Sequence, residues 1–172
     1  MLPIKVLIVD DSIVFRELLV QNLGRDPAIQ VVGTARDPFE ARDAILALKP
    51  DVMTLDIELP RMNGIEFLRK LMPQYPLPVV VISSLSDKVF DAMSAGAVDF
   101  VAKPAVSSRK QLEDFVRNEL LVKIKIASSA RISNIKKSVM LNHANPERMS
   151  VNRGNLGVAI GASTGGAEAT SA

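Results

Sequence analysis

"KVLIVDDS", residues 5–12, places two adjacent aspartates, Asp10 and Asp11, directly after a run of apolar residues. The apolar run is typical of a buried strand, and two carboxylates at its end repel each other and raise each other's pKa. A nearby positive charge removes that cost. The stretch therefore predicts a buried strand that ends at the two carboxylates, with Ser12 as the cap of the helix that follows, but by itself it does not distinguish a cation site from an ordinary helix start.

Four more short apolar runs follow along the chain, separated by stretches of helical period. They are IQVVGTA (29–35), DVMTLD (51–56), LPVVVIS (77–83) and DFVA (99–102). This alternation predicts βα units around a parallel sheet. Because each run is almost continuously apolar, we expect helices on both faces of that sheet. The fold class is therefore α/β, a doubly wound five-stranded parallel sheet, which we expect in the flavodoxin-like order 2-1-3-4-5.

Local signals mark the helix boundaries. Asp37 followed by Pro38 is the pattern of an N-cap and a first helical residue, and Pro50 ends the same helix. Asn63 opens a third helix, which we expect to stop before Pro73. Further helices are predicted over 87–95 and from about residue 107. The helix after Ser12 is expected to bury one stripe of side chains, formed by Ile13, Leu18, Leu19 and Leu23.

The composition narrows the class of protein. The chain has 172 residues, of which 48% are hydrophobic, so it can bury a substantial core. It contains no cysteine, which excludes disulfides and thiolate chemistry, and His143 is its only histidine. No apolar run approaches the roughly 18 residues needed to span a bilayer. We expect a soluble cytoplasmic protein without membrane insertion.

Charge divides the chain unevenly. Residues 1–102 hold 10 Lys and Arg against 14 Asp and Glu, a balance of −4, and residues 103–172 hold 11 against 5, a balance of +6. After residue 126 the regular alternation stops, and a polar stretch precedes a last apolar run. We expect an α/β domain over 1–126, a linker over 127–155 and the start of a second domain over 156–172.

The unusual polar residues fall where predicted strands end. Asp10 and Asp11 end the first strand, Asp56 the third and Ser83 the fourth, and Lys103 follows the fifth. In an open parallel sheet the site lies at the carboxyl ends of the strands. Each residue alone has an ordinary explanation as a cap or a turn. Together they predict a cleft in which carboxylates hold Mg²⁺, which prefers oxygen ligands, and Lys103 supplies a second positive charge.

The motifs VDDS, LDIELPRMNG, VVVISS and FVAKP resemble the receiver domain of two-component response regulators. The resemblance implies that Asp56 accepts a phosphoryl group from a histidine kinase. It implies that Mg²⁺ is bound by Asp11 directly, by Asp10 through water, by Asp56 and by the main-chain carbonyl of Glu58. It also implies that Lys103 pairs with the phosphoryl group, and that Ser83 and Phe100 form a conformational switch that responds to it.

The last apolar run, NLGVAIGASTGG (155–166), resembles the nucleophile region of the chemotaxis protein-glutamate methylesterases. That resemblance implies that Ser163 is the esterase nucleophile in a longer protein that demethylates chemoreceptors. An esterase of this type also needs a histidine and an acid, which the family supplies downstream, whereas His143 lies in a polar segment. We therefore expect phosphorylation without esterase activity, with the protein's own catalytic domain as a partner.

Two other functions remain open on the residues alone. One is a receiver joined to a DNA-binding domain through the basic C-terminal part, although that part has no helix-turn-helix pattern, and we expect no nucleic acid partner. The other is a small phosphohydrolase that uses the acidic residues. Steady turnover of a phosphate ester, with Asp56 required, would distinguish the phosphohydrolase from a protein phosphorylated once per molecule.

Overall fold

The computed structural model describes residues 1–105 and 107–130. Its centre is a five-stranded parallel sheet in the order β2-β1-β3-β4-β5, which confirms the predicted topology. The strands are β1 (Ile4–Val9), β2 (Ile29–Ala35), β3 (Val52–Leu55), β4 (Val79–Ser83) and β5 (Asp99–Ala102). The register pairs Val9 with Leu55, so the chain leaves β1 and β3 side by side at one edge of the sheet.

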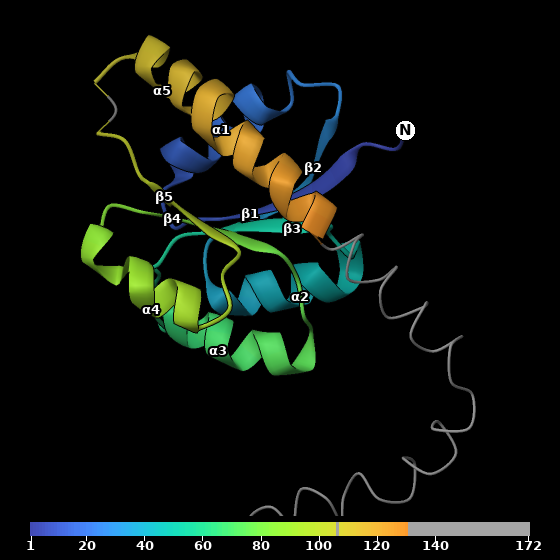
Figure 1. The fold of residues 1–172 in the computed structure, drawn as a ribbon, viewed down its shortest axis with the longest axis vertical. Helices are drawn as coiled ribbons and strands as arrows, with labels where there is room; N and C mark the ends of the chain where they lie inside the picture. The colour runs from blue at the N-terminus through green and yellow to red at the C-terminus, as the bar shows by residue number, and fades with distance from the viewer. Residues whose placement is uncertain (106, 131–172) are drawn as a thin grey trace, which may run out of the picture. The chain divides into compact units, whose positions relative to one another are not determined.

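Helices cover both faces of the sheet. Figure 1 shows α1 and α5 on one face and α2, α3 and α4 on the other. Their bounds are α1 (Ile13–Leu23), α2 (Pro38–Leu48), α3 (Gly64–Gln74), α4 (Val89–Ser94) and α5 (Arg109–Phe115). A 3₁₀ turn, Ser86–Lys88, precedes α4, and a π-helical segment, Val116–Leu120, extends α5. Helical structure then continues through residues 121–130.

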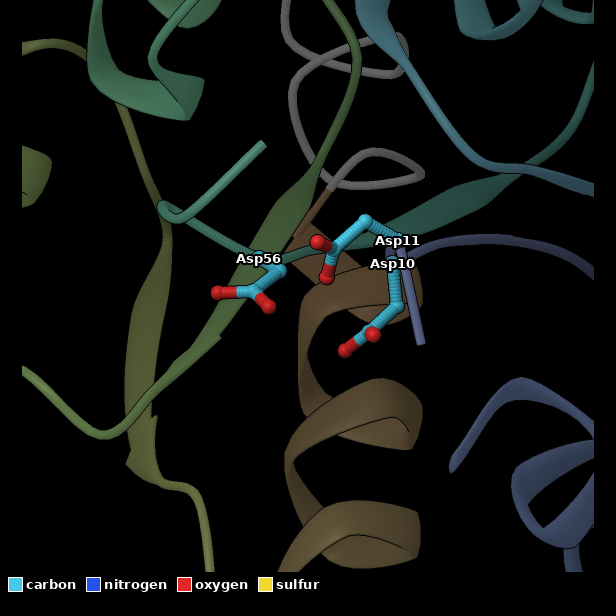
Figure 2. Close-up of side chains that lie close together, drawn as sticks. All are labelled: Asp10, Asp11 and Asp56. Carbon is cyan, nitrogen blue, oxygen red and sulfur yellow. The ribbon is translucent and has the colours of Figure 1, made fainter. Parts of the chain in front are cut away.

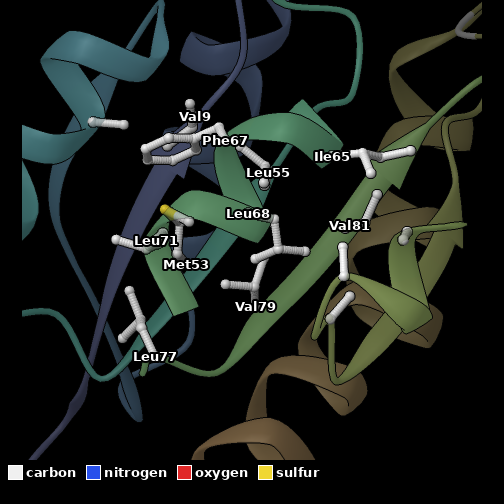
Figure 3. Close-up of a cluster of buried hydrophobic side chains, with 14 of the residues drawn as sticks. Val9, Met53, Leu55, Ile65, Phe67, Leu68, Leu71, Leu77, Val79 and Val81 are labelled. Atoms are coloured by element: carbon white, nitrogen blue, oxygen red, sulfur yellow. The ribbon is translucent and has the colours of Figure 1, made fainter. Parts of the chain in front are cut away.

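Each face has its own apolar core. The core under α2, α3 and α4 is shown in Figure 3, where Phe67, Leu68 and Leu71 of α3 lie over the strand residues Met53 and Val79. The other core lies under α1 and α5 and contains Ile8, Leu19 and Leu112 among its buried residues. Burial on both sides explains why the strands read as continuous apolar runs.

Three predicted helix starts agree with the structure, whereas the helices expected from residues 87 and 107 begin as α-helices at Val89 and Arg109. The Ser12 side chain accepts a hydrogen bond from Phe15 N, and Asn63 Oδ1 accepts one from Ile65 N. Asp37 caps α2 by accepting from the two backbone amides of Phe39 and Glu40. A cap depends on only a few consecutive residues, so the sequence alone identifies it.

Two predictions about the helices were wrong. Ile13 is 62% exposed, because the face of α1 that meets the sheet is formed by Phe15, Leu19 and Leu23. The third helix does not stop before Pro73 but includes it and ends at Gln74. A proline in the last turn is tolerated here because Tyr75 N still bonds the Leu71 carbonyl and closes the turn.

The last described helix passes the expected domain limit at residue 126. Ala127 is fully buried in the core under α1 and α5, so the helix packs on the domain beyond that limit. The expected linker and second domain lie otherwise outside the described residues, and the division proposed for them stays a prediction.

Candidate functional site

Three carboxylates meet at the carboxyl edge of the sheet. Figure 2 shows the side chains of Asp10, Asp11 and Asp56 close together, and one oxygen from each lies within 4.8 Å of the others. Asp10 and Asp56 are each only 2% exposed, whereas Asp11 is exposed. Asp10 and Asp56 follow the paired strand ends of β1 and β3, so the sheet register itself brings them together.

Lys103 joins the two buried carboxylates. Its Nζ donates to Asp10 Oδ2 at 2.7 Å and to Asp56 Oδ2 at 3.0 Å. Its backbone N–H donates to the Ser83 carbonyl at 2.9 Å, which holds the chain after β5 against the end of β4. The ammonium group also lies 4.5 Å from the centre of the Phe15 ring, within the range of a cation–π interaction.

Burial and charge shift the pKa values of this pair. Burial raises the pKa of Asp56, and the charge of Asp10 adds to that effect, while hydrogen bonds from Lys103 and from Glu58 N oppose it. Burial lowers the pKa of Lys103, but its hydrogen bonds to Asp10 and Asp56 outweigh this, so its pKa lies above the usual value. Lys103 is therefore protonated at neutral pH, and burial makes the Asp56 carboxylate more basic than an exposed aspartate.

Backbone amides hold the remaining carboxylate oxygens. Asp10 Oδ1 accepts from Ser12 N at 2.8 Å, and Asp56 Oδ1 accepts from Glu58 N at 3.0 Å. In formal charges, three carboxylates face the single ammonium group of Lys103. An excess of two negative charges on oxygen donors fits a divalent cation such as Mg²⁺.

The other predicted residues surround this cluster. Ser83 is fully buried, and its Oγ accepts a hydrogen bond from Leu85 N at 3.1 Å. Phe100 is half-buried and packs against the core under α4. Glu58 is exposed, and its side chain accepts a hydrogen bond of 2.7 Å from Ser84 Oγ. Ser163 and His143 lie outside the described residues.

Sequence reasoning missed three residues that shape the site. Phe15 contacts the Lys103 ammonium, and Arg16 Nη1 donates to the Asp10 carbonyl at 2.6 Å. Gly64 lies so close to the acceptor loop that a Cβ there would be 2.3 Å from the Asp56 carbonyl oxygen. The Asn-Gly pair at 63–64 indicated a helix start, but no local pattern indicates that a side chain at position 64 would clash with the backbone of Asp56. Phe15 and Arg16 likewise resemble ordinary helix residues in the sequence.

Comparison with known proteins gives consistent results. A family model described as the response regulator receiver domain matches residues 6–117. The crystal structure of the response regulator domain of Thermotoga maritima CheB is 40% identical and has a TM-score of 0.67. It is matched over 74% of this chain and 97% of its own. The CheX-CheY-BeF3-Mg²⁺ complex from Borrelia burgdorferi contains a chain that is 32% identical with a TM-score of 0.57, over 68% and 89% of the two chains.

Curated relatives extend the similarity past the described residues. A protein-glutamate methylesterase/protein-glutamine glutaminase 2 from Syntrophomonas wolfei is 58% identical over 96% of this chain and 48% of its own length. A protein of the same activity from Syntrophotalea carbinolica is 48% identical over 96% and 49%. The chain thus spans about half the length of these relatives. Within residues 1–105 and 107–130, no helix is long and apolar enough to cross a membrane.

Proposed function

The chain belongs to the response regulator receiver domain family, and from this premise we propose that Asp56 is phosphorylated while Asp10, Asp11 and Asp56 hold a Mg²⁺ ion. The observation that carries the proposal is the position of Lys103 Nζ, which donates to two buried carboxylates and leaves the three-carboxylate cluster with a formal excess of two negative charges. A second positive charge is needed before a negative phosphoryl group can approach. The Glu58 carbonyl and water complete the proposed ligands.

Each residue of the site has a role in the proposed phosphoryl transfer. A carboxylate oxygen of Asp56 attacks phosphorus, the new O–P bond forms, and the bond from phosphorus to the donor's histidine nitrogen breaks with its electron pair. When bound, Mg²⁺ neutralises charge on the phosphoryl oxygens. Lys103 can transfer one of its hydrogen bonds from Asp56 to the incoming group, since it is already within 3.0 Å. A histidine kinase is the proposed donor.

Ser83 and Phe100 are proposed to pass the signal on. The Ser83 side chain is fully buried at the end of β4, the strand next to β3 in the sheet, and its hydroxyl is proposed to move toward a phosphoryl oxygen on Asp56. That movement frees space beside β5, where half-buried Phe100 packs against the same core. The added charge of about −1.5 to −2 thereby biases the surface of α4, β5 and α5.

The named relatives guide the proposal for the longer protein. They are methylesterases, and they favour a receiver that controls a receptor-demethylating domain over one with a DNA-binding output. We therefore propose that this receiver acts in the cytoplasm on its own catalytic domain, with Ser163 as the nucleophile of that domain and chemoreceptors as its substrates. Phosphorylation relieves inhibition of the catalytic domain in this scheme.

The phosphorylation itself is tested by incubating the chain with acetyl phosphate and Mg²⁺ and mapping the adduct by mass spectrometry. A base-labile phosphoryl group on the peptide that contains Asp56 is expected, and none is expected in Asp56→Asn. Asp43→Asn, an exposed carboxylate on α2, is the matched control and should be labelled like the unmodified chain. Labelling of Asp56→Asn at the normal rate would remove Asp56 from the proposed role.

A further inference from the structure

Residues of α2 and α3 line a groove. Both helices lie on the face of the sheet opposite α1 and α5 (Figure 1). Its volume is about 400 Å³, and the residues that give it apolar walls are Ile45, Leu46, Met62, Phe67, Leu71 and Tyr75. Pockets that bind ligands fall in the range of about 300–1,000 Å³. None of the groove residues belongs to the proposed phosphorylation site, so the groove needs its own explanation.

The groove has a buried floor and an exposed apolar rim. Ile45, Phe67 and Leu71 are less than a tenth exposed, whereas Leu46 is 60% exposed and Phe39, at the other end of α2, is 41% exposed. Exposed apolar side chains that border a preformed hollow are typical of a surface that binds a partner. Neither exposed side chain is among the residues that form the core beneath the groove or pack against it.

Both helices that line the groove contribute a positively charged side chain. Among the described residues that line it, the charged ones are Arg42 on α2 and Lys70 on α3. The Arg61 guanidinium also lies near the groove, 5.8 Å from the Phe39 ring centre, and it pairs with Asp37 Oδ2 at 3.9 Å. Arg42 and Lys70 pair with Asp43 and Glu66 at 3.2 Å, but all four side chains are more than half exposed. Such exposed pairs contribute little and exchange easily for a partner's carboxylates.

Charge decides which occupant fits. Residues 131–172 of this chain hold five Lys and Arg against two Asp and Glu, so they would be repelled. A second copy that docks the same face would place Arg42 and Lys70 near their own counterparts, which is also unfavourable. We propose that the groove binds an acidic amphipathic helix of a partner protein, with apolar side chains on the floor and carboxylates on Arg42 and Lys70. This inference does not rest on the proposed phosphorylation.

The test uses the whole chain and synthetic helical peptides of about 16 residues, roughly four turns. The peptides carry Leu and Phe at i, i+3 or i+4 and i+7 in several arrangements, flanked by Glu, and a matched set carries Lys in place of Glu. Fluorescence anisotropy measures binding without Mg²⁺ or phosphodonor. We expect the Glu-flanked peptides to bind, and Arg42→Glu or Lys70→Glu to weaken binding at least about tenfold.

Arg69→Glu is the matched control, because Arg69 precedes Lys70 on α3 and is exposed but does not line the groove. It should change affinity by less than about twofold, since salt screens distant charges. The Arg42→Glu, Lys70→Glu double variant should prefer the Lys-flanked set. The proposal is overturned if no Glu-flanked peptide binds, if Arg69→Glu weakens binding as much, or if both peptide sets bind equally.

Two further measurements test the other occupants. Sedimentation of the unmodified chain should give a monomer at the concentrations used, and a dimer abolished by Leu46→Gln would replace the proposal with self-association. In ¹⁵N-labelled protein, amide signals of residues 131–172 should be the same in the unmodified chain and in Lys70→Glu without peptide. A change in those signals would identify the chain's own C-terminal part as the occupant and overturn the proposal.

Discussion

The ammonium nitrogen of Lys103 lies 2.7 Å from Asp10 Oδ2, although 93 residues separate the two along the chain. The same nitrogen reaches Asp56 Oδ2 at 3.0 Å. Lys103 therefore neutralises part of a buried acidic cluster that would otherwise be highly unfavourable. The site is held together by a cation before any metal binds.

Replacing Lys103 by Met should destabilise the metal-free chain by roughly 1–3 kcal/mol, because two buried carboxylates lose their charged partner. Mg²⁺ should then stabilise the variant more than the unmodified chain, since no ammonium competes for the same oxygens. Urea unfolding with and without MgCl₂ measures both effects. Lys110→Met, at an exposed position on α5, is the control and should change neither. Equal stabilisation of Lys103→Met and the unmodified chain by Mg²⁺ would contradict the competition.

Asp56→Asn should be more stable than the unmodified chain at pH 7, without Mg²⁺. Burial raises the pKa of Asp56 in the folded state above the value of 3.8 that it has when exposed. The folded state therefore binds this proton more tightly, and the stability from Asp56 falls as pH rises from 3.8 through the raised pKa. The advantage of the variant should shrink as pH is lowered toward 3.8. If the stability advantage of the variant grew on acidification, the pKa of Asp56 in the folded state would be lowered and not raised.

Asp37→Ala should cost about 1–2 kcal/mol, the usual loss for an N-cap. Asp37 Oδ1 accepts from Phe39 N and Glu40 N at 2.8 and 2.9 Å. The hydrogen bond from Glu40 N is the main cause of the lowered pKa of Asp37, which burial opposes. Asp37 therefore contributes stability above pH 3.8 that is lost as pH falls through the lowered pKa. Unfolding curves for Asp37→Ala and Asp37→Asn across this range provide the check, with Asn retaining most of the cap.

Gly64→Ala should slow phosphorylation and destabilise the fold by about 1–3 kcal/mol. The new Cβ would lie 2.3 Å from the Asp56 carbonyl oxygen and 2.9 Å from Ile57 Cα, which are backbone atoms that cannot turn aside. At Gly33 a Cβ would meet the end of the Leu48 side chain at 2.6 Å, and that side chain can move. Gly33→Ala is therefore the control. Normal acetyl phosphate labelling of Gly64→Ala would show that the loop adapts.

Phe15→Leu should weaken the hold on the Lys103 ammonium, which lies 4.5 Å from the ring centre. Phe15 is also buried in the core, so its replacement loses packing as well as the contact with the ammonium. A double-mutant cycle with Lys103→Met separates the two effects. A coupling of roughly 0.5–1 kcal/mol is expected from a cation–π interaction of this kind. A coupling of zero would mean that the ring packs only against the core.

Much of the fold could be predicted because its signals are local. The alternation of apolar runs and helical stretches predicted a parallel sheet of βα units, and the caps at Ser12, Asp37 and Asn63 involve atoms only two or three residues apart. The placement of acids and Lys103 at strand ends predicted their convergence, because parallel strands end at one edge. The confirmed predictions are of two kinds. Helix caps join residues that are close in the sequence, and the residues at strand ends are brought together by the parallel sheet.

The amino-acid sequence by itself determined the strands, most helix starts and the identity of the acidic cluster with Lys103. Only the tertiary structure decided that Ile13 faces solvent, that Phe15 lies beside the Lys103 ammonium, and that Gly64 has no room for a side chain. It also opened the groove between α2 and α3. The reason is physical: periodicity says which residues share a face, whereas contact across the fold depends on how separate elements pack, which no local pattern records.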